Sequence, residues 1–346
     1  MKFKANLFNG LLGGALIALS AVGLSSCSLV KEDLAECPVV EMRFIYEYNM
    51  EFANAFHKQA DCLDVYFYNS DGKLVDTRHI TDKSLLSDEN YRMTLELPGG
   101  AYHAVAYVGM GCEKTSFNHI NQPAIGTHFT DLHVKLDHQA LQDKSKARLH
   151  NHYYGSVDFT IDPDKSQLIT CEMMRNTNSI QIALQHTTGE PIDVNDFNFA
   201  IIDDNDDFQH DNNLLTTGEI TYIPWNTENR TTGLSDESHI WGYDQFHAAL
   251  SNFTTSRLVY DKDTRTTLHI TRADNGDTVL KVPLLNYILM FKNDRSGLNR
   301  DDMPDQEYLD RENSWNFVFF LDSDEMWVQT RIIVNDWEVR MNEAGF

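Results

Sequence analysis

The chain has 346 residues, with 28 basic and 52 acidic side chains and a formal net charge of −24. So acidic a surface repels nucleic acid and anionic lipid headgroups, which argues against nucleic-acid binding. Hydrophobic residues make up 42% of the chain and aromatic residues 11%, which excludes wholesale disorder, and the length suits two domains.

The first 26 residues have the layout of a signal peptide. Lys2 and Lys4 give a basic start, an uncharged apolar run follows over residues 7–24, and small residues precede Cys27. A transmembrane helix is the alternative, because a span needs roughly 17–25 apolar residues. The glycines at 10, 13 and 14, the asparagine at 9 and the small residues at its end argue against it.

The four residues Leu24-Ser25-Ser26-Cys27 resemble a bacterial lipobox. This resemblance implies that residues 1–26 are removed, that Cys27 carries palmitate and further acyl chains, and that residues 27–36 form a tether. Two or more chains hold a protein stably at a membrane, whereas one does so only marginally. Loss of Lys2 and Lys4 with the leader takes the formal charge from −24 to −26.

Four cysteines remain after Cys27. Cys37, Cys62 and Cys112 each lie at the edge of a strand-like run in the first half, whereas Cys171 lies within an apolar strand. An exported protein meets oxidising conditions, so we expect a disulfide between two of the first three, with the pair left open. No cysteine or histidine spacing indicates zinc.

Nearly every periodic segment after residue 38 alternates with period two, which predicts β-strands. In the first half, residues 62–76 form a hairpin with its turn at Asn69–Gly72, and residues 91–110 form two strands around Pro98-Gly99-Gly100. Further strands are predicted in the first half over residues 132–137 and 153–161.

The second half continues the pattern. Strands are predicted over 179–185, 197–204, 266–273, 277–282, 315–322 and 327–337. Helical signals are few and short, and cover residues 137–150, 241–251 and 284–290. We therefore predict an all-β fold of two antiparallel β-sandwich domains, over residues 37–163 and 167–346, with a polar seam at 162–166.

Several clusters of polar residues are candidate binding sites. The acidic run Asp203–Asp207 lacks the glycine and terminal glutamate of a calcium loop, so we interpret it, like Asp301–Glu307, as an acidic loop. His150 and His152 would share a face of a strand, but no third ligand is evident, which favours a surface strand over a metal site.

No catalytic motif is present: the chain has no GxSxG, HExxH, glycine-rich phosphate loop or nucleophilic Cys/His pattern. We therefore expect no enzymatic activity, no cofactor and no bound metal.

The five tryptophans could instead stack on sugar rings. Trp315, Trp327 and Trp337 lie at strand ends and suit a core, whereas Trp225 follows Pro224 in a loop and is the best candidate for exposure.

A family resemblance emerges from the order of these segments. The run "SCSLVKEDLAECP", the strands "DVYFYNSDGKLV" and "LPGGAYHAVAYVG", then "TTSRLV" and "QTRIIVNDWEV" are similar to the fimbrial anchor lipoproteins of Bacteroidales, which are related to the fimbrillins. The resemblance implies two transthyretin-like β-sandwiches at the base of a fimbrium. The Lys31-Glu32-Asp33 cluster also resembles a surface-export signal, with a solvated spacer as the alternative.

The resemblance further implies that the protein joins fimbrillin shaft subunits to the outer membrane and limits fimbrial length, engaging fimbrillin by strand addition. Only residues 338–346 follow Trp337 and few of them are apolar, so we expect the chain to accept a strand and not to donate one. A surface glycan-binding lipoprotein is the alternative function, and a hydrolase is a more distant one.

Overall fold

The computed structural model describes residues 38–233, 245–261, 266–290, 292, 303–334 and 337–340. Cys27 and Cys37, which the sequence predictions single out, lie outside the described residues. Pro38–Phe346 forms one compact unit. No helix within the described residues is both long enough and apolar enough to span a membrane.

The largest sheet contains seven strands from the first half of the chain. They are β1 (Val40–Ile45), β2 (Leu63–Asn69), β3 (Leu74–Ile80), β4 (Met93–Thr94), β5 (Gly100–Val108), β8 (Tyr153–Ile161) and β9 (Gln167–Arg175). Their order is β3-β2-β5-β8-β9-β1-β4. The predicted hairpin over residues 62–76 is confirmed, because β2 pairs antiparallel with β3 around a turn in which Gly72 has φ +71°.

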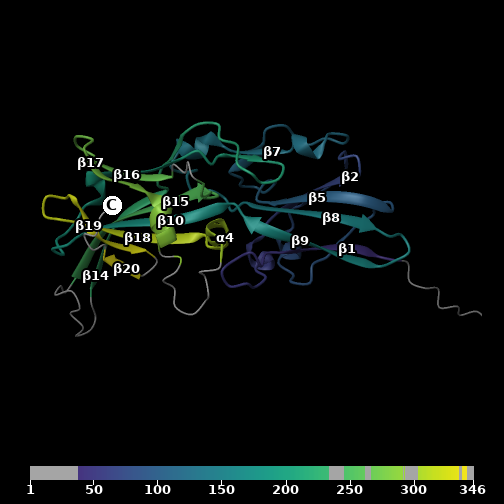
Figure 1. Ribbon diagram of the computed structural model, residues 1–346, viewed down its shortest axis with the longest axis horizontal. Helices are drawn as coiled ribbons and strands as arrows, with labels where there is room; N and C mark the ends of the chain where they lie inside the picture. Colours follow the sequence, from purple (N-terminus) through teal and green to yellow (C-terminus); the bar gives the residue numbers. More distant parts are fainter. Residues whose placement is uncertain are drawn as a thin grey trace, which may run out of the picture. The chain divides into compact units, whose positions relative to one another are not determined.

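A smaller sheet combines strands from both halves. Its members are β6 (Phe117–His119), β7 (His133–Leu136) and β12 (Asp207–Gln209), in the order β12-β7-β6. In Figure 1, β7 lies on one side of β5 and β8, and β1 and β9 lie on the other. The β7–β12 pairing joins residues about seventy positions apart, so strands of the first half are completed by a strand of the second.

Two further sheets form the second sandwich. The six-stranded sheet has the order β14-β15-β10-β18-β19-β20, and the four-stranded sheet has the order β13-β11-β16-β17. Their strands are β10 (Thr177–His186), β11 (Phe197–Asp203), β13 (Ile220–Tyr222), β14 (Asn226–Gly233), β15 (Gln245–Ser256), β16 (Thr267–Arg272), β17 (Thr278–Pro283), β18 (Ser314–Leu321), β19 (Trp327–Val334) and β20 (Trp337–Arg340).

The helices are short. They are α1 (Phe56–Gln59), α2 (Lys83–Leu86), α3 (Leu284–Met290) and α4 (Asp305–Arg311), with 3-10 turns η1 (Phe129–Asp131), η2 (His138–Leu141) and η3 (Val194–Asp196). The fold is therefore all-β, with two transthyretin-like sandwiches in tandem and a few short helices, as predicted.

Two of the three helical predictions are wrong in whole or part. Residues 284–290 form α3, but only His138–Leu141 of residues 137–150 is helical, as a 3-10 turn. The described part of 241–251 belongs to strand β15, which pairs with β10 along eight residues. Pairing on both sides, with β10 and β14, overrides the weak local helical preference.

The polar turn at 162–166 connects two strands of one sheet. Beyond it, β9 pairs in parallel with β1 and meets β8 at Tyr153–Gly155. The domain boundary at this turn stays a prediction, and the pairing of β9 favours a change of sheet at Asn176, between β9 and β10.

Two hydrophobic clusters hold these sheets together. One lies within the first half and includes Met42 and Phe44 of β1, Val65 of β2, and Cys171 and Met173 of β9. The other begins on the opposite face of β5 and continues through β7 and β12 into β10 and β18. Burial of apolar surface in this shared cluster joins the two halves.

Candidate functional site

The disulfide lies at one end of the first sheet. Cys62 directly precedes β2 and Cys112 follows β5, and the pairing of Leu63 with Val108 brings the two cysteines together. They form a disulfide with a Cα–Cα distance of 5.3 Å, whereas Cys171 is a buried free thiol. The structure thus selects one of the pairs that the sequence left open.

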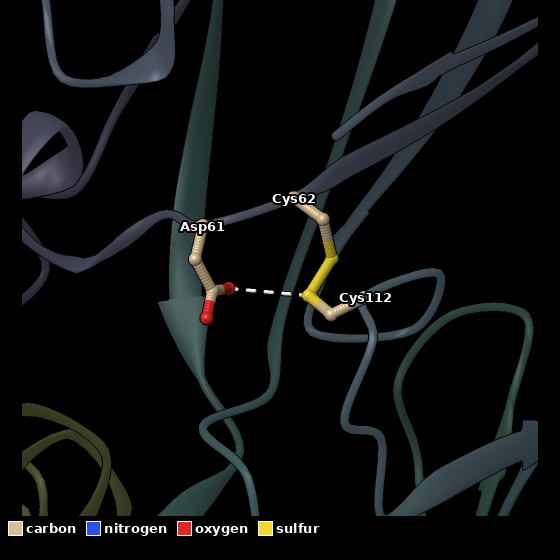
Figure 2. Close-up of side chains that lie close together, drawn as sticks. All are labelled: Asp61, Cys62 and Cys112. Carbon is tan, nitrogen blue, oxygen red and sulfur yellow. Dashed lines mark hydrogen bonds between the residues drawn. A yellow bond between two sulfur atoms is a disulfide. The ribbon is translucent and has the colours of Figure 1, made fainter. Parts of the chain in front are cut away.

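Two titratable groups border this disulfide. Asp61 Oδ1 lies 3.1 Å from Cys112 Sγ (Figure 2), and Asp61 Oδ2 lies 3.1 Å from His150 Nε2. Asp61, Cys62 and Cys112 are metal-ligand types within reach of one another. However, cysteine binds a metal as its thiolate, and the disulfide engages both sulfur atoms, so these cysteines cannot act as metal ligands in the oxidised protein.

The sequence suggested that His152 lies on a surface strand, but the structure places this residue in the core. Its side chain is fully buried between the rings of Tyr107 and Phe117, with ring centroids 5.7 Å and 4.5 Å away. Burial, together with smaller electrostatic effects of the nearby His119 and His150, lowers the pKa of His152 to about 3. His152 is therefore a neutral core residue, and it is separated in role from His150, which pairs with Asp61.

Asp203, Asp206 and Asp207 are buried, so the acidic run is not the solvated loop that the sequence suggested. Asp206 Oδ2 lies 2.5 Å from His138 Nε2 and 3.4 Å from Lys135 Nζ, and Asp207 pairs with His133. Burial raises the pKa of Asp206, but hydrogen bonds from His138 and Thr217 and the charge of Lys135 together hold it below its usual value.

The carboxylates of these pairs come from the second half of the chain and their partners from the first. The pairs therefore stabilise the contact between β12 and β7. Asp203 has no such cation among the described residues: burial raises its pKa to about 6, although Thr266 donates a hydrogen bond of 2.7 Å to it.

The second acidic run is only partly described. Within it, Asp305 pairs with Lys292 and Glu307 with Arg311 at the start of α4.

The tryptophans do not form an exposed row in the described part of the chain. Trp315 is buried, and Trp225 and Trp327 are partly buried. The Arg148 guanidinium lies 4.7 Å from the Trp225 ring, which covers part of the residue expected to be most exposed. Trp241 lies outside the described residues, as does the side chain of Trp337.

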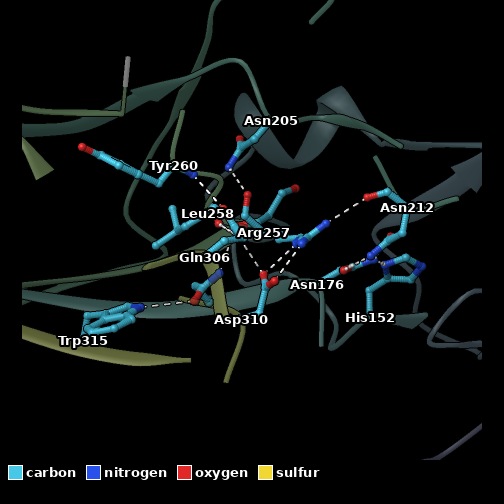
Figure 3. A network of polar contacts seen from close by, with 12 residues as sticks. His152, Asn176, Asn205, Asn212, Arg257, Leu258, Tyr260, Gln306, Asp310 and Trp315 are labelled. Carbon is cyan, nitrogen blue, oxygen red and sulfur yellow. Dashed lines mark hydrogen bonds and ion pairs between the residues drawn. The ribbon is translucent and has the colours of Figure 1, made fainter. Parts of the chain in front are cut away.

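A polar network connects the two halves at the end of β15 (Figure 3). Arg257 donates two hydrogen bonds of 2.7 Å to the two carboxylate oxygens of Asp310 in α4, and a third of 3.0 Å to the carbonyl of Asn212. Asn212 and Asn176 exchange side-chain hydrogen bonds of 2.7 and 3.0 Å. Nearly all of this network is out of solvent, so its partners must remain in place.

A second contact ties the first half to α4. The Arg311 guanidinium lies 4.1 Å from the ring of Tyr48 and 4.6 Å from that of Phe52, and it bonds Glu307 at 2.7 Å. Arg257 lies within the segment TTSRLV, but the sequence predicted a partner neither for it nor for Arg311. A single charged residue gives no sequence signal that reveals a distant partner.

The first sheet also has open edges. β8 and β9 pair only at Tyr153–Gly155, and beyond this point β8 follows β5 while β9 follows β1. Within the described residues, no strand pairs with the other side of β8 at 156–161 or of β9 at 167–172. The Thr160 carbonyl accepts a 2.9 Å hydrogen bond from Gln167 Nε2, and the remaining main-chain groups of these two edges have no strand partner within the described residues.

Comparison with known proteins identifies the family. A sequence profile of the fimbrillin-A associated anchor proteins Mfa1 and Mfa2 matches residues 34–343. The chain belongs to this family. The anchor family is thus confirmed, and a search of curated proteins finds no match.

Solved structures agree with this assignment. A candidate adhesin from Bacteroides thetaiotaomicron is 43% identical, covers 90% of this chain and all of its own, and has a TM-score of 0.81. A candidate polysaccharide-binding protein of the same species is 29% identical over 88% of this chain and 99% of its own, with a TM-score of 0.72. The anchor protein Mfa2 of Porphyromonas gingivalis shares the fold at 16% identity, with coverage of 88% and 100% and a TM-score of 0.60.

Proposed function

We propose that this protein is the lipid-anchored base subunit of a fimbrium, which holds the shaft at the outer membrane and limits its length. The match to the anchor family over residues 34–343 carries this proposal. Acylation of Cys27 after removal of residues 1–26 supplies the membrane attachment, with residues 27–36 as the tether. We propose a structural role without catalysis.

The shaft subunit would be engaged by strand addition. The open edges at 156–161 of β8 and 167–172 of β9 support this part of the proposal, because an added strand gains main-chain hydrogen bonds there. Leu168 also faces solvent on β9, with 50% of its surface exposed. An apolar side chain on an open edge favours contact with another chain.

A photo-crosslinking residue tests the edge. With the crosslinker at Leu168, we expect a covalent product with the shaft fimbrillin in intact cells. Ile125 is the matched control, since it is also an exposed apolar residue, at 69%, but lies in a loop. Crosslinks from Ile125 alone, or from neither position, would exclude this edge as the contact.

Deletion of the gene tests the anchor role itself. Without the base subunit, cells should still polymerise shaft subunits but should shed the fimbriae or grow them unusually long. Electron microscopy of the deletion strain and its complemented parent measures both outcomes. Fimbriae of unchanged length that stay firmly attached would rule out the proposal.

Glycan binding is a second candidate function. The candidate polysaccharide-binding relative favours it, whereas the described tryptophans do not, because none of them is fully exposed. A sugar site would therefore need another platform than the tryptophans.

A further inference from the structure

A hollow of about 570 Å³ opens on the face of the first sheet that carries His103 and Asp158. His103 of β5 lies directly opposite Asp158 of β8, and Ala101 lies opposite Thr160 two residues further along. Because side chains two positions apart share a face, these four residues form the floor. The β2–β3 turn at 69–72 and the Phe129 ring form the sides.

The sides are held in place by contacts of their own. The Phe129 N–H donates a 2.9 Å hydrogen bond to the carbonyl of Gly72, and the Phe129 ring packs 5.2 Å from the His103 ring. Gly72 has a positive φ, and a Cβ there would clash with the imidazole of His128. The turn and the ring therefore form a preorganised wall, which lowers the cost of binding a ligand.

The hollow presents several polar groups that still have bonding capacity. His103 Nδ1 bonds one carboxylate oxygen of Asp158 at 2.7 Å, and the Asp158 side chain is 88% exposed, so its second oxygen is open to a ligand. Asn69 Oδ1 accepts from the N–H groups of Asp71 and Lys73, which directs its amide NH₂ outward. Ser70 and Thr160 add hydroxyl groups.

We propose that this hollow binds an uncharged sugar residue of an oligosaccharide. Neighbouring sugar hydroxyls can donate to Asp158 while accepting from the Asn69 amide and the Ser70 and Thr160 hydroxyls, and a sugar C–H face can pack on Phe129. None of the residues that line the hollow is Lys or Arg. Together with the net charge of −24, this disfavours uronate-containing and sulfated glycans.

The inference is independent of the anchor role. Asp158 belongs to the β8 edge segment 156–161, but its side chain lies on the face of the sheet, whereas strand addition would use main-chain groups. Asp158→Asn leaves those main-chain groups unchanged, so it need not affect the shaft. A cationic peptide is the competing occupant, because a lone exposed carboxylate also attracts lysine. The charge state of the ligand therefore decides between the two.

The test uses the purified full chain in detergent and titration calorimetry. The probes are cellohexaose, maltohexaose, xylohexaose and N-acetylchitohexaose, with hexagalacturonate as an acidic comparison and hexalysine as a competitor. We compare wild type with Asp158→Asn and Phe129→Leu. Asp274→Asn is the matched control, since Asp274 is also exposed but lies in the β16–β17 turn.

We expect at least one neutral oligosaccharide to bind with a Kd of about 10 mM or tighter. Asp158→Asn should weaken it at least about tenfold and Phe129→Leu several-fold, while Asp274→Asn stays within about twofold. Circular dichroism verifies that each variant is folded. No neutral binding, equal binding by Asp158→Asn, binding of hexagalacturonate alone, or binding of hexalysine alone would each overturn the proposal. Attached fimbriae of normal length in the Asp158→Asn strain separate this result from the anchor role.

Discussion

Asp61 places a carboxylate beside the disulfide, with Oδ1 3.1 Å from Cys112 Sγ. A thiolate that attacks this bond, and the thiolate that leaves it, both meet this negative charge. Asp61→Asn should therefore speed reduction by dithiothreitol at alkaline pH by roughly three- to tenfold. Thiol release in a time course measures the rate, with Asp274→Asn as the control. Equal rates in all three proteins would show that Asp61 does not protect the bond.

His152 should make stability depend on pH. Its pKa in the folded protein is lowered to about 3, so it stays neutral there while the unfolded chain binds a proton below its ordinary pKa of about 6.5. Its contribution to the free energy of unfolding is complete above pH 6.5 and is lost as the pH falls below this value. Linkage gives a loss of about 2 kcal/mol between pH 7 and pH 5.

His152→Phe should remove this dependence. Urea denaturation at pH 7 and pH 5 should show a loss on acidification that is smaller by about 2 kcal/mol than in wild type. The comparison with wild type matters because Asp203, whose pKa is raised to about 6, acts in the opposite sense over this range. Ile182→Val, in the same core, is the control. It should lower the free energy of unfolding by about 1 kcal/mol at both pH values and leave the difference between them unchanged. An equal loss in wild type and His152→Phe would contradict the assignment.

At the scale of the elements, α4 is joined to the end of β15 by the Arg257–Asp310 pair, whose side chains are 14% and 3% exposed. Removing one partner leaves a buried charge without its counter-ion. Arg257→Met or Asp310→Leu alone should therefore lower the free energy of unfolding by about 3–5 kcal/mol. The double variant should recover most of this loss, because it leaves neither charge.

Chemical denaturation of the two single variants and the double variant forms the complete cycle. Arg230→Met is a matched control, because its ion pair with Glu228 is exposed and should contribute less than about 1 kcal/mol. Single variants within about 1 kcal/mol of wild type would mean that the junction does not depend on this pair.

Whether the sequence predicts an element depends on how far apart in the chain the residues that determine its pairing lie. The β2–β3 hairpin follows from alternation around Asn69–Gly72, because both signals are local. The parallel pairing of β1 with β9 and the pairing of β7 with β12 join distant residues, and period two carries no information on partner choice. Residues 245–251 are wrongly predicted as a helix for the same reason, because the local sequence does not show that they pair with β10 and β14.

The candidate sites show the same limit. Spacing excluded the calcium loop at Asp203–Asp207 and the zinc patterns, since those motifs have fixed local geometry. Spacing did not reveal that Asp206 pairs with Lys135 and His138, or that Asp207 pairs with Lys135. Nor did it reveal that Asp158 pairs with His103 at the floor of a hollow. These contacts depend on the tertiary arrangement of β5, β7, β8 and β12.

For the whole molecule, the net charge and the proposed lipid attachment have opposite effects on membrane binding. With residues 1–26 removed, as we propose, the chain would carry a formal charge of −26, so an anionic membrane surface would repel it. Attachment through Cys27 would then rest on its acyl chains, whose binding is hydrophobic and insensitive to salt. High salt should therefore fail to release the wild-type protein from outer membranes.

Cys27→Ser should abolish incorporation of a palmitate analogue and remove the protein from the outer-membrane fraction. Cys37→Ser is the matched control, because the same substitution ten residues later leaves the lipobox intact and should preserve both label and location. Metabolic labelling with fractionation and immunoblotting measures both. Label retained in Cys27→Ser would refute lipidation at this residue. Release of wild type by salt would show instead that ionic contacts hold the protein, despite its charge.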